Sequence, residues 1–240
     1  MQKKKLLNDE KILISVVVPA FNEEKNIASC LKALKKQNFS KQNYEIIVIN
    51  NASTDKTGEI ADKIGVKVVF EPQKGLVFAL KKGFDNSRGQ MIAVTDADTI
   101  VPQDWFEKMV ATFQKNSSLV SLSGRIIFQP KNFLILMAEL TMNVFSLFSH
   151  SGFGCNFAFK KEIYQKIGLS ESPLCWETDF STRAKRYGQT AFLWRNPVIT
   201  SSRHYRGREG LKYACRAALN GLSITLFKKT IFNSFSDIRE

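Results

Sequence analysis

Two carboxylates separated by one residue follow an apolar run near the middle of the chain. The stretch "IAVTDADTIVP", residues 92–102, places them at Asp96 and Asp98. Alternate residues of an extended segment point the same way, so both carboxylates can face one ligand. Acids of this kind commonly hold the divalent cation that neutralises a bound diphosphate. The spacing therefore indicates a metal site at Asp98, and the alternative is an acid that ends a strand before Pro102.

No glycine-rich phosphate-binding motif accompanies these acids. After its first apolar run the chain reads "PAFNEE", residues 19–24, where a dinucleotide-binding fold would have GxGxxG. The GxxxxGK[ST] motif does not occur in the sequence either. The pattern argues against a Rossmann dehydrogenase, and a diphosphate bound here would need a cation to neutralise it. For Glu23 and Glu24 the alternative interpretation is the acidic first turn of a helix.

The elements that must position these residues alternate along the first half of the chain. Runs rich in β-branched residues separate stretches with helical spacing, which predicts an α/β fold with a mostly parallel sheet and right-handed crossovers. Ligands bind such sheets at the carboxyl ends of the strands. The expected strands cover residues 12–18, 45–49, 66–70, 91–95 and 119–128, with two further pieces near 190–202. The expected helices cover residues 24–37, 56–64, 76–88 and 103–115.

Composition and cysteine spacing indicate one ordinary globular domain. The chain has 240 residues, of which 44% are hydrophobic and 24% charged, so it can bury a sizeable core. Its four cysteines are far apart and form no CxxC pair. This spacing is typical of reduced thiols rather than of a disulfide framework or a zinc ribbon. We therefore expect a cytoplasmic location.

The charge is strongly positive and is concentrated in the second half. The formal net charge is +13, and residues 180–216 contain nine Lys or Arg against a single acid, Glu209. Such an excess suits anionic membranes, phosphorylated substrates or nucleic acid. Acids at the predicted strand ends would repel a nucleic-acid backbone from that crevice. Nucleic acid is therefore not an expected partner.

Taken in order, the motifs resemble those of glycosyltransferase family 2. "PAFNEE", "VINNASTD", "EPQKGLVFALKKGF" and "TDADT" resemble the family's strand-end motifs, the last being its DxD signature. "GFGCNFAFKKEIYQKIG" resembles the strand and helix on the acceptor side, and "WETDFSTRAKRYG" the catalytic helix. The resemblance implies a single GT-A-like α/β domain, Rossmann-like, with a mostly parallel central sheet flanked by helices.

The resemblance also implies boundaries along the chain. It extends over residues 12–205, with a nucleotide-sugar-binding half at 12–100 and an acceptor half at 101–205. A basic tail, 1–11, precedes this domain, and a basic amphipathic segment, 206–240, follows it.

Individual roles follow where residues match the family's motifs. Asp98 would bind Mg²⁺ or Mn²⁺. His204 follows a predicted strand among arginines, and its imidazole could be a third metal contact or a diphosphate contact; the alternative is a solvated surface histidine. Arg203 would contact the donor diphosphate or else solvate a loop. The resemblance implies donor-binding roles for Pro19, Ala20, Asn22, Glu23, Asn50, Asn51, Lys74, Gly75 and Asp96.

Two motifs depart from the family pattern. The second-strand motif usually has an Asp that accepts a hydrogen bond from the nucleobase, and here Asn50 and Asn51 stand in its place. Asn still accepts through its amide oxygen, so base binding is retained while the identity of the base is open. In the catalytic motif Glu177 occupies the position of the base. Asp179 is the alternative base, or else an ion-pair partner of Arg183 four residues along the same helix.

The implied reaction is a metal-dependent, inverting transfer of a sugar from a nucleotide diphosphate donor to a lipid-linked, glycolipid or saccharide acceptor. A base is needed for a hydroxyl acceptor but not for a lipid phosphate, which is already ionised. The alternatives are a sugar-phosphate nucleotidyltransferase and a non-catalytic basic binding module. The first would need a basic, Gly-rich first loop, and "PAFNEE" is acidic.

Residues 133–148, "FLILMAELTMNVFSLF", are almost wholly apolar. Sixteen residues fall short of the roughly 20 that span a bilayer, and Glu139 lies in the middle. The segment is either a helix buried against the sheet or an interfacial helix beside the acceptor site. We expect the second arrangement to give peripheral contact with the inner face of the cell membrane.

Overall fold

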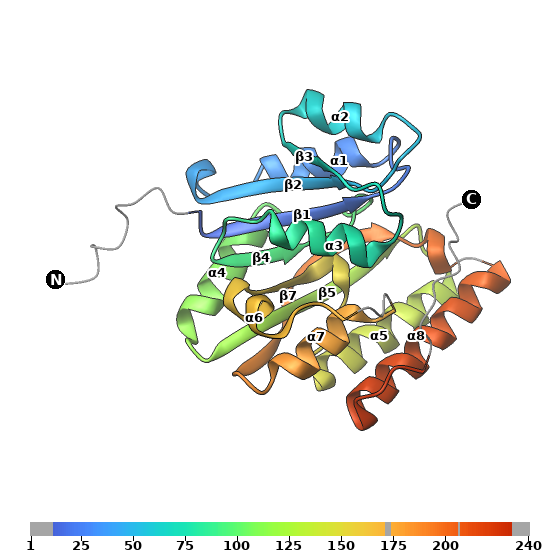
Figure 1. The fold of residues 1–240 in the computed structure, drawn as a ribbon. Helices are drawn as coiled ribbons and strands as arrows, with labels where there is room; N and C mark the ends of the chain where they lie inside the picture. The colour runs from blue at the N-terminus through green and yellow to red at the C-terminus, as the bar shows by residue number, and fades with distance from the viewer. Residues whose placement is uncertain (1–11, 171–173, 206, 232–240) are drawn as a thin grey trace.

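A computed structural model describes residues 12–170, 174–205 and 207–231 (Figure 1). The predicted basic tail, 1–11, lies outside the described residues, as do residue 206 and residues 232–240 of the predicted C-terminal segment. The central feature is a seven-stranded sheet in the order β3-β2-β1-β4-β6-β5-β7. Its strands are β1 (Ile14–Ala20), β2 (Tyr44–Asn50), β3 (Lys67–Phe70), β4 (Met91–Val94), β5 (Leu119–Gln129), β6 (Phe157–Lys160) and β7 (Gln189–Ser201).

The predicted mostly parallel α/β sheet is confirmed. Strands β1 to β4 pair in parallel, β6 pairs antiparallel with both β4 and β5, and β5 pairs in parallel with β7. The two strand pieces expected near residues 190–202 are one strand instead. Strand β7 follows β5 through two register irregularities, so a local break in the pairing replaces the expected break in the strand.

Helices cover both faces of the sheet. Side chains of α1 and α4 belong to one buried cluster, which includes Leu31 and Phe106, and those of α3, α6 and α7 belong to a second, which includes Phe84 and Phe180. Figure 1 shows α3, α6 and α7 in front of the sheet and α1 behind it. The helices are α1 (Ile27–Lys35), α2 (Thr57–Ile64), α3 (Leu76–Asp85), α4 (Trp105–Lys115), α5 (Phe133–Ser149), α6 (Lys161–Ile167), α7 (Trp176–Ala184) and α8 (Gly207–Phe227).

The sequence of β1 explains its central position. The strand "ISVVVPA" is buried along nearly its whole length, as expected for a strand with helices on both faces. Helix α3 can approach it closely because Gly83 has no side chain. A Cβ at this position would lie 2.3 Å from Cγ1 of Val17.

The strand order creates a crevice at the carboxyl ends of β1 and β4. From β1 the chain continues outward through β2 and β3 on one side, and β4 lies on the other side. Ligands of open α/β sheets bind at such switch points. The segments that follow β1, β2 and β4 carry the polar motifs found in the sequence. Among the described helices, none is both long and apolar enough to cross a membrane.

Candidate active site

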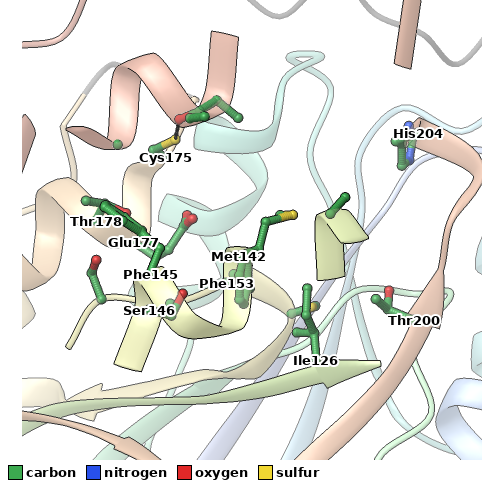
Figure 2. A pocket seen from close by; sticks show the side chains of 18 of the residues that line it. Ile126, Met142, Phe145, Ser146, Phe153, Cys175, Glu177, Thr178, Thr200 and His204 are labelled. Atoms are coloured by element: carbon green, nitrogen blue, oxygen red, sulfur yellow. Dashed lines mark hydrogen bonds between the residues drawn. The ribbon is translucent and has the colours of Figure 1, made fainter. Parts of the chain in front are cut away.

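A cavity of about 530 Å³ lies beside the end of β4. Asp96, Asp98, Glu177 and His204 all line it, although they come from three separate parts of the chain. Figure 2 shows Glu177 and His204 on opposite sides, with the apolar side chains of Met142 and Phe153 between them. The fold thus brings four of the predicted site residues to one space.

Asp98 is part of a buried charged cluster at the polar end of the cavity. Its Oδ2 lies 3.1 Å from Nη2 of Arg203, and the same nitrogen contacts Oε1 of Glu23. Both carboxylates are largely buried. Burial alone lowers the pKa of Arg203, but the hydrogen bond to Glu23 and the charges of Asp98, Glu23 and Asp96 raise it overall. The guanidinium therefore stays positively charged beside the predicted metal ligand.

Two neighbours complete the surroundings of Asp98. The hydroxyl of Thr200, on β7, lies 3.5 Å from Oδ1 of Asp98 and accepts a hydrogen bond from Thr99 at 2.9 Å. His204 accepts a hydrogen bond from Nε of Arg203 at 3.3 Å. Sequence reasoning missed Thr200, because residue 200 comes beside residue 98 only through the antiparallel bridge between Ile100 and Ile199, which are far apart in the sequence.

The available ligands fit a cation that is bound together with a substrate. Across the described part of the chain, no group of three or more His, Cys, Asp or Glu side chains is arranged to hold a metal ion. Mg²⁺ and similar cations are usually held by one or two carboxylates together with substrate phosphates, rather than by the protein alone. Asp98 offers one such carboxylate, and His204 offers an imidazole on the same cavity.

Glu177 lies in the first turn of α7 and lines the same cavity. Burial raises its pKa to about 8; a backbone hydrogen bond lowers it in part, and the charge of Asp96 adds a smaller rise. A carboxyl group that titrates near neutral pH can accept a proton efficiently under physiological conditions. The environment of Glu177 is therefore suited to a general base.

Asp179, the alternative base, has a different environment. Its Oδ2 lies 2.8 Å from Nη2 of Arg183, within an ion pair along α7. Arg183 also donates hydrogen bonds to the carbonyl oxygens of Ile167 and Gly168, at 2.5 and 3.2 Å. The pair therefore fastens α7 to the end of α6. Asp179 is not among the residues that line the cavity.

The predicted donor-binding residues after β1 and β2 are joined by hydrogen bonds. Asn22, with a left-handed φ of 53°, accepts a hydrogen bond from the backbone of Thr54 at 2.9 Å. Asn50 accepts one from the backbone of Ser53 at 3.2 Å. The carbonyl of Ala20, which follows Pro19 at the end of the strand, accepts from the backbone of Asn51. The contacts of Asn22 and Ala20 hold the two strand ends next to each other, and that of Asn50 shapes the loop after β2.

Asn51 fixes the loop that precedes α3. Its Oδ1 accepts a hydrogen bond from the backbone of Gly75 at 2.8 Å, and its Nδ2 donates to the carbonyl of Gln73 at 2.6 Å. Gly75 has a φ of 137°, a conformation that glycine alone adopts easily. Lys74 lies 4.9 Å from the ring centre of Phe21, so its charge is near the end of β1. Asn51 thus positions Lys74 and Gly75 at the crevice.

Much of the rest of the lining is apolar. It includes Ile126, Met142, Phe145, Phe153 and Leu222, contributed by β5, α5, α8 and the segment before β6. The cavity therefore combines carboxylates and an imidazole with an apolar wall supplied largely by two helices. Such a space fits a ligand that has both polar and apolar parts.

Comparison with known proteins agrees with this arrangement. The family model described as "Glycosyl transferase family 2" matches residues 15–168. A Methanococcus voltae protein, named dolichyl N-acetyl-alpha-D-glucosaminyl phosphate 3-beta-D-2,3-diacetamido-2,3-dideoxy-beta-D-glucuronosyltransferase, is 27% identical over 80% of this chain and 67% of its own. Glycosyltransferase AglE of Haloferax volcanii is 34% identical over 41% of this chain and 34% of its own, so the chain spans about a third of that relative.

A solved structure has the same fold. The mannosyltransferase PcManGT from Pyrobaculum calidifontis, in complex with GDP-Man and Mn²⁺, superposes with a TM-score of 0.72 at 18% identity over 90% of this chain and 63% of its own. The fold class is thereby confirmed as GT-A. With a family model that matches more than half of its length, the chain belongs to glycosyltransferase family 2.

Proposed function

We propose that the chain transfers a sugar from a nucleotide diphosphate donor to an acceptor in a single displacement, with Glu177 as the general base. One observation carries the proposal. The cavity brings Asp96 and Asp98, at the end of β4, together with a carboxyl group whose pKa lies near neutral. Through a bound cation the aspartates would hold the leaving diphosphate, and the carboxyl group of Glu177 would serve as the base for the attacking hydroxyl.

The donor would bind across the ends of β1, β2 and β4. Asp98 and His204 would hold Mg²⁺ or Mn²⁺ together with the diphosphate, and support comes from the Mn²⁺ and GDP-Man in the PcManGT complex. When bound, the cation would offset the negative charge that develops on the leaving nucleotide. Arg203 carries a positive charge beside Asp98 and can bind a phosphate through two parallel hydrogen bonds.

Residues of the chain accept the proton of the acceptor and hold the base in position. The Glu177 carboxylate takes the proton of the acceptor hydroxyl as that oxygen attacks the anomeric carbon. The bond between this carbon and the diphosphate oxygen breaks, and its electron pair leaves with the nucleotide. Attack from the side opposite the leaving group inverts the anomeric configuration. Asp179 and Arg183 act by holding α7, and therefore Glu177, in place.

The acceptor would be an amphiphile. Its hydroxyl has to reach Glu177, and the adjoining part of the cavity is lined by Met142, Phe145 and Leu222. An acceptor whose apolar chain lies against these side chains and whose sugar lies beside the carboxylates would match both parts of the lining. The name of the Methanococcus voltae relative, which contains a dolichyl phosphate-linked sugar, supports the same substrate class.

Donor turnover tests this proposal. The protein is incubated with Mn²⁺ and a panel of UDP-, GDP- and dTDP-sugars with a short-chain polyprenyl-linked sugar as acceptor, and release of nucleoside diphosphate is measured. Release is expected with one donor and should disappear on chelation of the metal. Asp179→Asn is the matched control for Glu177→Gln, since both remove one carboxylate from the same helix. No release with any donor would overturn the proposal.

A further inference from the structure

Helix α5 has buried polar side chains and many exposed apolar ones. Glu139 and Asn143 are only 2% and 1% exposed. They cover the backbone of β5 where that strand has passed the end of β6. Asn143 accepts from the backbone N–H of Ile126 and donates to its carbonyl, both at 2.9 Å, and Glu139 accepts from the N–H of Phe128 at 2.8 Å.

The opposite face of α5 is apolar and exposed. Phe133, Leu134 and Phe148 are 73%, 75% and 80% exposed. A helix in contact with water normally has the reverse arrangement. Single exposed hydrophobic residues are normal on a protein surface, but a contiguous apolar stripe usually marks an interaction site. The stripe consists of Phe133, Leu134, Leu140, Val144, Leu147 and Phe148.

Helix α8 extends this surface. Figure 1 shows α5 and α8 at the same edge of the molecule, and a Cβ at Gly221 would lie 3.7 Å from the ring of Phe145. Leu222, Leu226 and Phe227 on α8 are exposed as well. Leu222 also lines the cavity, so the exposed surface reaches the cavity. We call the α5 stripe and these three α8 residues the α5–α8 face.

The charges around the α5–α8 face are positive. Among the described side chains of residues 131–149 and 212–231, the exposed charged ones are all Lys or Arg, and the single carboxylate, Glu139, is buried against Lys131. Lys228 and Lys229 follow the end of α8 directly. A second copy of this face would bring like charges together, whereas anionic headgroups would attract them.

We propose that the α5–α8 face docks on an anionic lipid bilayer, with its apolar side chains in the interfacial region and the lysines among the headgroups. This orientation places Leu222, where the exposed surface meets the cavity, against the membrane. A substrate with a lipid chain could then enter without passing through water. Docking is a property of the surface alone and does not depend on whether sugar transfer takes place.

Vesicle flotation tests the proposal directly. The full chain, without donor, metal or acceptor, is mixed with vesicles of phosphatidylcholine or of phosphatidylcholine with a quarter phosphatidylglycerol, at low and high salt. We expect flotation with the anionic vesicles and weaker flotation at high salt. The triple variant Phe133→Ser, Leu134→Ser, Phe148→Ser should bind at least about tenfold more weakly.

A matched control removes exposed aromatic residues from other surfaces. Phe70→Ser with Tyr187→Ser changes two exposed side chains, one on β3 and one between α7 and β7, that are not part of the α5–α8 face, and should leave flotation unchanged. Lys228→Gln with Lys229→Gln should weaken binding to anionic vesicles only. Equal flotation of wild type and triple variant, or no flotation of the wild type, would overturn the proposal. A wild-type dimer that the triple variant dissociates, without vesicle binding, would assign the face to a second copy and also overturn it.

Discussion

The pH dependence of transfer follows from the surroundings of Glu177. The base acts in its ionised form, and its pKa is about 8 because the carboxyl group is buried and lies near the charge of Asp96. The value of kcat/KM for the donor reports the free enzyme, in which this pKa applies. At pH 7 about one tenth of the carboxyl groups are ionised, and at pH 9 about nine tenths. We therefore expect kcat/KM to rise roughly tenfold between these pH values.

Initial rates of nucleoside diphosphate release, measured in constant-ionic-strength buffers from pH 6 to 9.5, give the profile. Glu177→Gln should lower the rate at pH 9 by roughly 10² or more, as is typical for a general base, and should leave a flat profile. Asp179→Asn should keep the rise near pH 8, because its carboxyl group pairs with Arg183 outside the cavity. A wild-type profile that is flat between pH 7 and 9, or a rise that persists in Glu177→Gln, would refute the assignment of the base.

Four further outcomes are expected. Asp98→Asn should weaken Mn²⁺-dependent donor binding at least about tenfold in calorimetric titrations while the circular dichroism is unchanged; equal affinity would exclude Asp98 as a ligand. Arg203→Gln should lower the free energy of unfolding by roughly 2 kcal/mol in urea titrations, because Glu23 and Asp98 lose their cation, and an unchanged value would contradict this. Asn143→Leu should lower the free energy of unfolding by about 2 kcal/mol or more, although it makes α5 more apolar, since the N–H and the carbonyl of Ile126 both lose their partner. A neutral or stabilising effect would contradict the inward orientation of the polar side chains of α5. The pKa of Glu177 is raised in the folded state, so wild-type stability should fall as pH rises from about 4.5 to about 8, and Glu177→Gln should melt higher than wild type at pH 9 but not at pH 5.

The sheet and its strand ends could be predicted because their signal is local. Buried parallel strands are continuous apolar runs, as in β1 and β4, and they end where polar residues begin. Asp96 and Asp98 were predicted from this pattern alone. The antiparallel strand β6 and the single long strand β7 carry weaker local signals. Their positions depend on pairing with β4 and β5, which lie far away in the sequence.

Whether Glu177 or Asp179 faces the cavity depends on the rotation of α7 about its own axis. Side chains two residues apart on an α-helix point about 200° away from each other, so only one of the two can face the cavity. The sequence provides an i, i+4 partner for Asp179 in Arg183, but it does not show which face of the helix meets the sheet. The structure supplies that orientation by tying Arg183 to the carbonyl groups at the end of α6.

The orientation of α5 illustrates a second limit. Polar residues at 139, 143 and 146 follow i, i+4 and i+7, so they share one helix face. Ordinary patterning would direct such a face to water. It faces inward here because the backbone of β5 beyond β6 needs hydrogen-bond partners, a demand that becomes visible only once the strand order is known.

The configuration of the newly formed glycosidic bond tests the proposed reaction most directly. Once a donor and an acceptor support turnover, the product is purified and the coupling constant of its anomeric proton is compared with that of the donor sugar by NMR. A single displacement with Glu177 as base predicts the opposite anomeric configuration in the product. The same configuration as in the donor, formed at a rate that Glu177→Gln does not lower, would contradict both the mechanism and the role of this cavity.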